Sequence, residues 1–148
     1  MSDNKDIIIG SISTAVSQLL GASAAALMRT AGASASHRLW PDLPTGRSWQ
    51  EAGAIMSEGV KQLGGFGEFA ITGEEEGVVK IQFQRCFFAG FAGESGKPCG
   101  EQAICFFGFG LVEETYKRLT GNQVKVQLTR REDGSQTCFE TITLRKGA

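Results

Sequence analysis

The chain has 148 residues, a length that fits one domain able to bury roughly 70% of the surface that its unfolded form exposes. Its 15 basic and 16 acidic residues give a formal net charge of −1 without a basic cluster, which excludes the electrostatic footprint of a nucleic-acid-binding protein. The opening MSDNKDIIIG matches neither a secretory signal nor a transit peptide, and no apolar run approaches the roughly 18 residues of a membrane span. We therefore expect residues 1–148 to form a single cytoplasmic domain with reduced cysteines.

The first half of the chain is predicted to be mostly helical. Apolar residues recur at three- and four-residue spacing from Ile8 to Leu27, which predicts one long amphipathic helix, or two in series, over residues 6–31. The next segment, AGASASHRLWPDLPTGR, contains two prolines and several small residues, so we expect a loop or a broken helix there. Ser48 and Glu51 then form the S-x-x-E pattern of a capping box, which predicts that a further helix begins at this point.

Two β-hairpins with a helix between them are predicted for the second half. A glycine pair at 64–65 ends the preceding helix, and residues 67–86 then alternate apolar and polar side chains around an acidic turn. Residues 101–121 have helical spacing, whereas residues 122–145 alternate around the turn EDGS. Short turns within each pair predict an antiparallel sheet of about four strands, with helices packed on it. The fold class is therefore α+β, in the order helix, helix, hairpin, helix, hairpin.

Phenylalanine is concentrated in one stretch of the chain. Residues 83–110 contain seven of the ten phenylalanines and three of the four cysteines, separated by glycines. Neighbours such as Phe106 and Phe107 cannot point the same way on a helix, so one must face the sheet and the other a second surface. An ordinary core explains any single ring, but the whole cluster predicts an apolar cavity or a homodimer interface. The predicted ligand-binding residues are Phe87, Phe88, Phe91, Phe106, Phe107 and Phe109.

The C-terminal third contains a distinctive combination of cysteines and glycines. One cysteine lies early in a predicted helix (AICFFGFGLVEETYKRLTG), and a turn glycine is followed four residues on by Cys-Phe (GSQTCFETI). These features resemble the 4-vinyl reductase domain family, and the order of elements agrees over most of residues 20–145. That fold is similar to the TRAPP vesicle-tethering subunits and to the sensor domains of aromatic-responsive bacterial activators. The resemblance implies an apolar or aromatic ligand, which aromatic-sensing members hold partly with a histidine and a tryptophan that residues 50–148 lack.

The resemblance also implies a zinc site, and this chain departs from it. Zinc-containing members have a helix cysteine, then Glu-x-x-Cys on the next strand, then a final cysteine after the turn. Cys105 and Cys138 match the first and last positions, but Gln127 and Arg130 replace the glutamate and the middle cysteine. An amide and a guanidinium are not zinc ligands, and a structural site needs four donors, so we expect no cofactor unless another cysteine rebuilds the site. The plainer interpretation of the two matched cysteines is small buried hydrophobic side chains. The four cysteines of the chain, Cys86, Cys99, Cys105 and Cys138, are the weak candidates for metal ligands.

Three functions follow from these patterns. The first is a stand-alone module that binds an apolar or aromatic small molecule, as a sensor or carrier, in a homodimer that signals through a downstream protein partner. The second is an enzyme or accessory protein in tetrapyrrole vinyl reduction, although the chain has no dinucleotide fingerprint and no proton donor besides Tyr116 and the cysteines. The third is a dimeric assembly scaffold without a ligand. We predict no catalytic residue, because His37 is the only histidine and no nucleophile motif accompanies it.

Overall fold

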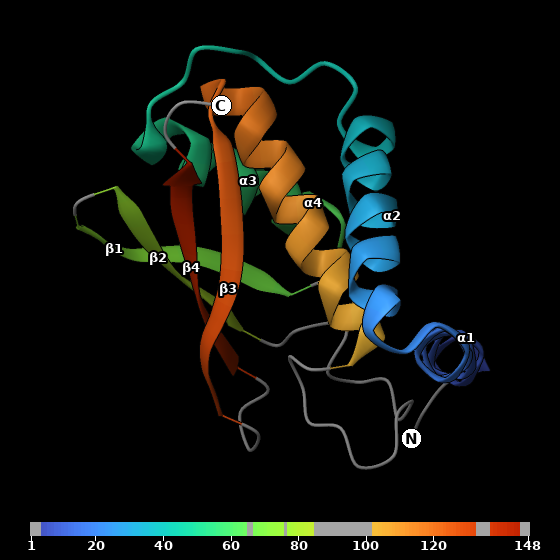
Figure 1. The fold of residues 1–148 in the computed structure, drawn as a ribbon. Coiled ribbons are helices and arrows are strands. Elements are labelled where there is room, and N and C mark those ends of the chain that lie inside the picture. Colours follow the sequence, from blue (N-terminus) through green and yellow to red (C-terminus); the bar gives the residue numbers. More distant parts are fainter. Residues whose placement is uncertain (1–3, 65–66, 76, 85–101, 133–136, 146–148) are drawn as a thin grey trace.

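The fold is an α+β arrangement of a four-stranded antiparallel sheet and packed helices, as the sequence predicted (Figure 1). The computed structural model describes residues 4–64, 67–75, 77–84, 102–132 and 137–145. In chain order its elements are α1 (Asn4–Leu20), the 3₁₀ turn η1 (Gly21–Ser23), α2 (Ala24–Leu39), α3 (Trp49–Gln62), β1 (Glu68–Glu75), β2 (Val78–Gln84), α4 (Ala103–Thr120), β3 (Gln123–Glu132) and β4 (Thr137–Arg145).

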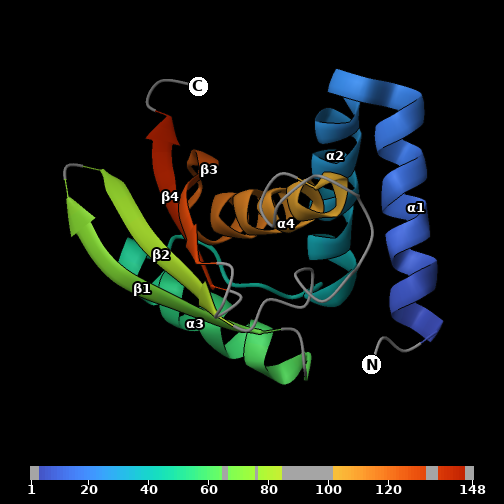
Figure 2. The same cartoon turned by 90° about the horizontal axis from the view of Figure 1, so that it is seen from below.

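The elements form successive layers. The strands lie in the order β1-β2-β4-β3, each antiparallel to its neighbour, so β1 and β3 are the two edges. α3 packs against β1 and α4 against β3. α2 covers the side of α4 that faces away from the sheet, and α1 lies outermost (Figure 2). α4 therefore packs against both the sheet and α2 and connects the two layers.

The main core lies between the sheet and the two inner helices. Val79, Ile81 and Phe83 point inward from β2 and are all buried, whereas Lys80 and Gln84 between and beyond them are exposed. This is the alternation that the sequence predicted for a half-buried strand. The helices complete the cluster with Ala52, Met56, Val60, Phe109, Val112, Tyr116 and Leu119.

The helix ends follow the predicted signals. Ser48 accepts a hydrogen bond from the Glu51 backbone N–H (3.1 Å), and the Ser48 backbone N–H donates to the Glu51 carboxylate (3.3 Å), which completes the capping box of α3. These bonds lower the pKa of Glu51, with the backbone bond from Ser48 as the largest cause. Gly121 ends α4 with a φ of 77°, a left-handed conformation that glycine adopts without steric cost.

α2 continues further than the sequence suggested. It runs through Leu39, across residues that were expected to form a loop or a broken helix. The small residues serve close packing: a Cβ at Gly32 would collide with the Phe107 carbonyl oxygen, and one at Gly110 with the Arg29 carbonyl oxygen. Glycine and serine therefore stand in this helix because α4 lies directly against it, and tertiary packing outweighs their low helix propensity.

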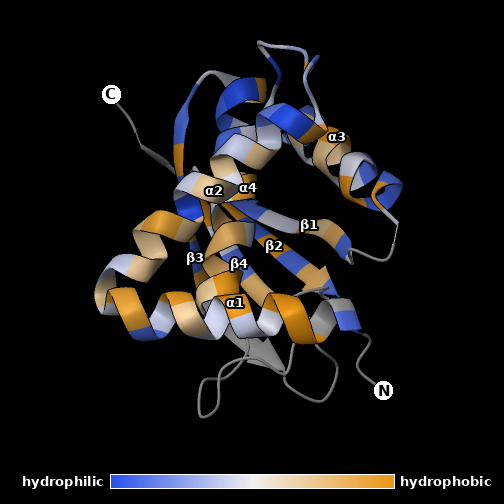
Figure 3. Cartoon of the chain, turned by 90° about the vertical axis from the view of Figure 1, so that its right-hand side faces the viewer, coloured by the Kyte–Doolittle hydropathy of each residue, from blue (hydrophilic) through white to orange (hydrophobic). Residues whose placement is uncertain are grey.

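The N-terminal helices form an apolar stretch that the sequence reading did not anticipate. Ile7–Leu39 has the length and mean hydropathy of a membrane-crossing helix, and only 17% of its most apolar window is buried. The stretch is not one straight rod, because η1 interrupts it at Gly21, where φ is 53°, and α1 turns away from α2 (Figure 2). In the fold the stretch forms two helices, α1 and α2, and apolar residues lie on the exposed side of α1 (Figure 3).

Candidate functional site

The predicted phenylalanine cluster is divided between two surfaces. Phe109 is buried in the main core, and the partly buried Phe106 packs edge-on against it with ring centroids 5.5 Å apart. Phe107 points elsewhere: with Leu39 and Leu63 it lines a recess of about 860 Å³ between α2 and the end of α3, which we call the Phe107 recess. The other predicted ligand-binding residues, Phe87, Phe88 and Phe91, lie outside the described residues.

A second, more apolar pocket lies between the end of α2, α3 and α4, and we call it the Trp40 pocket. Its volume is about 400 Å³, within the range of roughly 300–1,000 Å³ that is typical of small-molecule sites. Most of its walls are hydrophobic, with a few polar groups among them, the composition expected of such a site. The lining residues are Trp40, Leu43, Ala54, Ile55, Met56, Glu58, Gly59, Gln62 and Thr115.

The tryptophan of this pocket is held from two sides. Arg118 on α4 donates hydrogen bonds to the backbone carbonyls of Ser36 (2.8 Å) and Trp40 (2.7 Å), which fixes the end of α2. On the other side the indole lies against Gly59 of α3, where an added Cβ would come within 3.1 Å of the ring. A side chain at position 59 would therefore press on the indole, and glycine leaves the room that the ring occupies.

A chain of hydrogen bonds orients the polar group on the α4 side of the pocket. Arg118 donates to the Ser36 hydroxyl oxygen (3.1 Å), and the Ser36 and Thr115 hydroxyls lie 2.8 Å apart. The Thr115 hydroxyl donates to the Leu111 carbonyl (2.7 Å), so its oxygen must accept from Ser36. A hydroxyl oxygen has two lone pairs, so Thr115, which lines the pocket, retains one acceptor position.

Tyr116 follows Thr115 in α4 but belongs to the core. It is fully buried and packs against the rings of Trp49 (5.5 Å) and Phe69 (6.4 Å), and its hydroxyl has no hydrogen-bond partner among the described residues. Burial raises the pKa of Tyr116 far above its usual range, and the charge of Glu74 raises it further. The hydroxyl therefore stays protonated, and no acid or base within the described part of the chain bonds to it.

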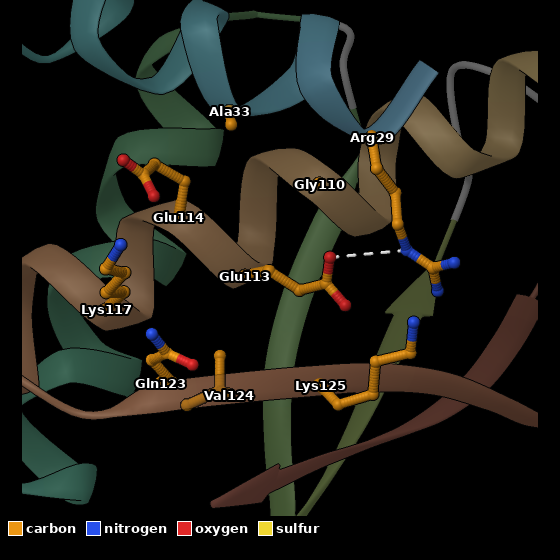
Figure 4. Close-up of a pocket in the computed structure, with 9 residues that line it drawn as sticks. All are labelled: Arg29, Ala33, Gly110, Glu113, Glu114, Lys117, Gln123, Val124 and Lys125. Carbon is orange, nitrogen blue, oxygen red and sulfur yellow. Dashed lines mark ion pairs between the residues drawn. The ribbon is translucent and has the colours of Figure 1, made fainter. Parts of the chain in front are cut away.

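The outer edge of β3 is covered by an ion pair from two helices. The Val126 backbone N–H donates to Glu113 of α4 (2.9 Å), and Arg29 of α2 donates to the Val126 carbonyl (3.1 Å). The Arg29 Nε lies 3.3 Å from the Glu113 carboxylate (Figure 4). The same guanidinium stacks 5.3 Å from the Phe106 ring centre, a cation–π contact. These side chains bond to the backbone groups of Val126, which have no neighbouring strand to pair with at this edge.

The metal candidates do not form a described cluster. Cys105 is buried in the first turn of α4, and Gln127 is exposed on β3. Outside the described part lie Cys86, Cys99 and the side chains of Arg130 and Cys138. No three His, Cys, Asp or Glu side chains among the described residues form a group that could hold a metal ion. The described residues therefore do not test the zinc site that the resemblance implies, and we derive no chemistry from zinc.

Sequence reasoning missed the Trp40 pocket. Trp40 stands in the segment that was expected to be a loop, and no motif marks it. One signal was available: Gly59 lies inside a helix, where glycine costs about 1 kcal/mol relative to alanine unless something packs on it. The partner of that glycine, 19 positions away in the chain, could not be named from spacing alone.

The comparisons with known proteins give a fold and no family. No family model matches the chain, and no curated protein matches it. Among solved structures, the chain is similar to the crystal structure of the phenol-responsive sensory domain of the transcription activator PoxR with phenol. The TM-score is 0.62 at 11% sequence identity, over 97% of this chain and 76% of that one. At this identity the likeness shows the fold alone, and membership of the 4-vinyl reductase domain family stays a prediction.

Proposed function

We propose that the protein is a small-molecule-binding module for an apolar or aromatic ligand, acting as a sensor or carrier. One observation carries the proposal: a tryptophan-walled apolar pocket of about 400 Å³ in a fold that resembles a sensory domain solved with phenol. The proposal includes the predicted membership of the 4-vinyl reductase domain family and a cytoplasmic location with a downstream protein partner.

The chemistry of the Trp40 pocket favours a one- or two-ring molecule. An apolar cavity of roughly 150 Å³ is enough to take up benzene, so about 400 Å³ leaves room for a substituted ring. Trp40, Ile55 and Met56 offer aromatic, aliphatic and thioether surface, which gains from excluding water. The spare acceptor position of Thr115 suits a ligand hydroxyl, so a phenolic compound matches both features of the site.

The predicted phenylalanine site is the alternative location for the same ligand. Phe107 contributes to a larger recess, and Arg38 supplies a cation at its rim. We propose the Trp40 pocket first because its lining is held by the Arg118 and Ser36 hydrogen bonds, and a preorganised site loses less entropy on binding. The two locations share no lining residue, so single variants can separate them.

The test is a titration of phenol and toluene, followed by tryptophan fluorescence and calorimetry. Ala54→Phe places a phenyl ring into the Trp40 pocket from an exposed position of α3, which leaves the core unchanged. We expect this variant to weaken binding by about tenfold or more, because the ring occupies the ligand volume. Ala26→Phe is the matched control, since Ala26 is exposed on α2 and lines none of the described pockets.

Each outcome of this titration has one meaning. No uptake of either compound by the wild-type protein contradicts the binding function. Unchanged uptake in Ala54→Phe together with loss in Phe107→Trp moves the site to the Phe107 recess. Equal loss in Ala54→Phe and in the Ala26→Phe control would mean that added aromatic bulk on a helix disturbs the protein generally, and the pocket assignment would then fall.

We also propose a homodimer through the outer face of α1. Ile8, Ile12, Ala15 and Leu19 are exposed at spacings of four, three and four residues, the seam of a helix that packs on another helix. Residues 7–28 contain no charged side chain. An uncharged seam fits a second copy of itself, because no charge repels the copy or selects a different partner.

Light scattering measures the mass of this assembly directly. We expect the wild-type protein to have the mass of two chains and Ile12→Lys to have the mass of one, since a charge in the seam would be buried unpaired. Gln18→Lys, an exposed position beside the seam, is the control that should remain dimeric. A wild-type mass of one chain, with or without binding to lipid vesicles, contradicts the dimer.

A further inference from the structure

The polar groups of the Trp40 pocket lie at different depths. Thr115 and Met56 are each only 1% exposed, so they form the buried end of the pocket. Glu58 and Gln62 are exposed residues of α3 and form its rim. A ring that lies against Trp40 therefore has a hydroxyl acceptor at the buried end and a carboxylate and an amide at the open end.

The geometry of α3 places both rim side chains on the face that lines the pocket. Glu58 and Gln62 are four positions apart and lie on the same face as Ile55, which precedes Glu58 by three positions. All three residues line the pocket. The Gln62 amide donates to the Glu58 carboxylate (3.4 Å), so the two side chains meet along this face.

No cation of the described chain neutralises the rim. Glu58 is the only ionisable side chain among the described lining residues, and no described Lys, Arg or His lies within ion-pairing distance of it. Arg118 does not line the pocket, and its guanidinium donates to backbone carbonyls at and after the end of α2. The described lining therefore has one negative charge, which a cationic group of a ligand can pair with.

We propose that the ligand of the Trp40 pocket is an aromatic amine, an inference that rests on the proposed function. Its ring lies against Trp40, and its ammonium group pairs with Glu58 at the rim. An ammonium group forms a charge-assisted hydrogen bond with a carboxylate, and the face of an indole attracts a cation within about 6 Å. An aromatic carboxylate is repelled by Glu58 and finds no cation in the described lining. The pocket thus selects its ligand by charge as well as by shape.

The alternative location of the ligand has the opposite charge. Arg38 is the only ionisable side chain among the described residues that line the Phe107 recess. No described carboxylate lies within ion-pairing distance of Arg38. A ligand in that recess would gain from a carboxylate and lose from an ammonium group. The charge preference of the protein therefore also distinguishes the two locations.

The experiment is a calorimetric titration of the full chain with phenethylamine, phenethyl alcohol and hydrocinnamate at constant ionic strength. These compounds share a phenyl ring on a two-carbon linker and end in an ammonium, a hydroxyl and a carboxylate group. We expect the wild-type protein to bind phenethylamine about tenfold more tightly than hydrocinnamate, because attraction and repulsion at an exposed carboxylate are each worth about threefold. The affinity for the alcohol should lie between the two.

Three variants test the role of the rim carboxylate. Glu58→Gln keeps the size of the side chain and should bring the ratio of the two affinities to about one. Glu58→Lys should reverse the preference in favour of hydrocinnamate. Glu75→Gln is the matched control, because it removes the same charge from an exposed position of β1 that lines none of the described pockets, and it should keep the wild-type ratio. Melting temperatures should stay close to the wild type, since both positions are exposed.

Each contrary result has a separate meaning. Equal affinity of the wild type for the three compounds, or tighter binding of hydrocinnamate, would overturn the aromatic amine and leave the aromatic function standing. A ratio that Glu58→Gln keeps, or that Glu75→Gln loses as well, would overturn the pairing with Glu58. Failure of the wild type to take up phenol, toluene and phenethyl alcohol contradicts the proposed function itself.

Discussion

The two sides of α4 differ in the kinds of residue that they carry. The inner side faces the sheet and is wholly buried in the main core. Its residues are Phe109, Val112, Tyr116 and Leu119. The outer side faces α2, where small residues and hydrogen bonds accompany a second, smaller apolar cluster around Met28 and Ala103. Its residues are Gly110, Glu114, Thr115 and Arg118.

The difference indicates what each contact can tolerate. Stability on the inner side comes from apolar area removed from water, so side chains of similar volume should be exchangeable there. The outer side depends on the close approach of two backbones and on specific donors and acceptors. The Trp40 pocket borders the outer side through Thr115. The candidate site therefore combines hydrophobic walls with one polar group from the hydrogen-bonded side of α4.

The largest effect is expected from the smallest change on the outer side. Gly110→Ala adds one methyl group that would collide with the Arg29 backbone, so α2 and α4 must separate. We expect a loss of about 3 kcal/mol in the free energy of unfolding, measured with urea, despite the better helix propensity of alanine. Leu119→Ala on the inner side removes three carbons and should cost a similar amount, about 2–5 kcal/mol.

Gly73→Ala is the control for adding a methyl group in place of a glycine hydrogen. A Cβ at Gly73 would meet no atom closer than 4.0 Å, so the change should stay within about 0.5 kcal/mol. If Gly110→Ala proved as stable as the wild type, α2 would not lie directly on α4, and the contrast between the two sides would disappear.

The same contrast explains how much of the fold the sequence could predict. Val79, Ile81 and Phe83 bury one face of a strand, and the sequence shows this burial as apolar residues at every second position. Capping signals at Ser48 and Gly121 are equally local. The helical end of α2 was not predicted, because Gly32 and its neighbours have low helix propensity and the contact of Gly32 with Phe107 of α4 leaves no local signal.

The candidate site depends on still longer connections. The Ser36 and Thr115 hydroxyls meet across 79 positions, and Arg118 reaches the Trp40 carbonyl across 78. No periodicity records such pairs, since each residue alone is typical of a helix surface. The phenylalanine cluster was easy to see in the sequence, but its members have different roles. Phe109 is buried in the core and Phe107 lines a recess, and composition alone could not distinguish the two.

Two isosteric substitutions test the difference between the two sides of α4 through smaller changes in the free energy of unfolding. Thr115→Val keeps the shape and removes the hydroxyl that accepts from Ser36, so we expect a loss of about 1 kcal/mol in urea unfolding. Val112→Thr places a hydroxyl in the apolar core and should cost about 1–2 kcal/mol, reduced if the hydroxyl bonds a carbonyl one turn back. If both substitutions lower the free energy of unfolding, the inner side of α4 requires an apolar group at position 112 and the outer side a polar group at position 115.

Ligand binding gives the Thr115→Val protein a second readout. Its pocket keeps the same volume and apolar walls, so toluene should bind as it does to the wild type. Phenol should bind more weakly, because its hydroxyl loses the acceptor position on Thr115. Equal weakening of both compounds would point to a general disturbance of the pocket, and no change in either would place the ligand hydroxyl away from α4. Only a selective loss of phenol links the polar side of α4 to recognition as well as to stability.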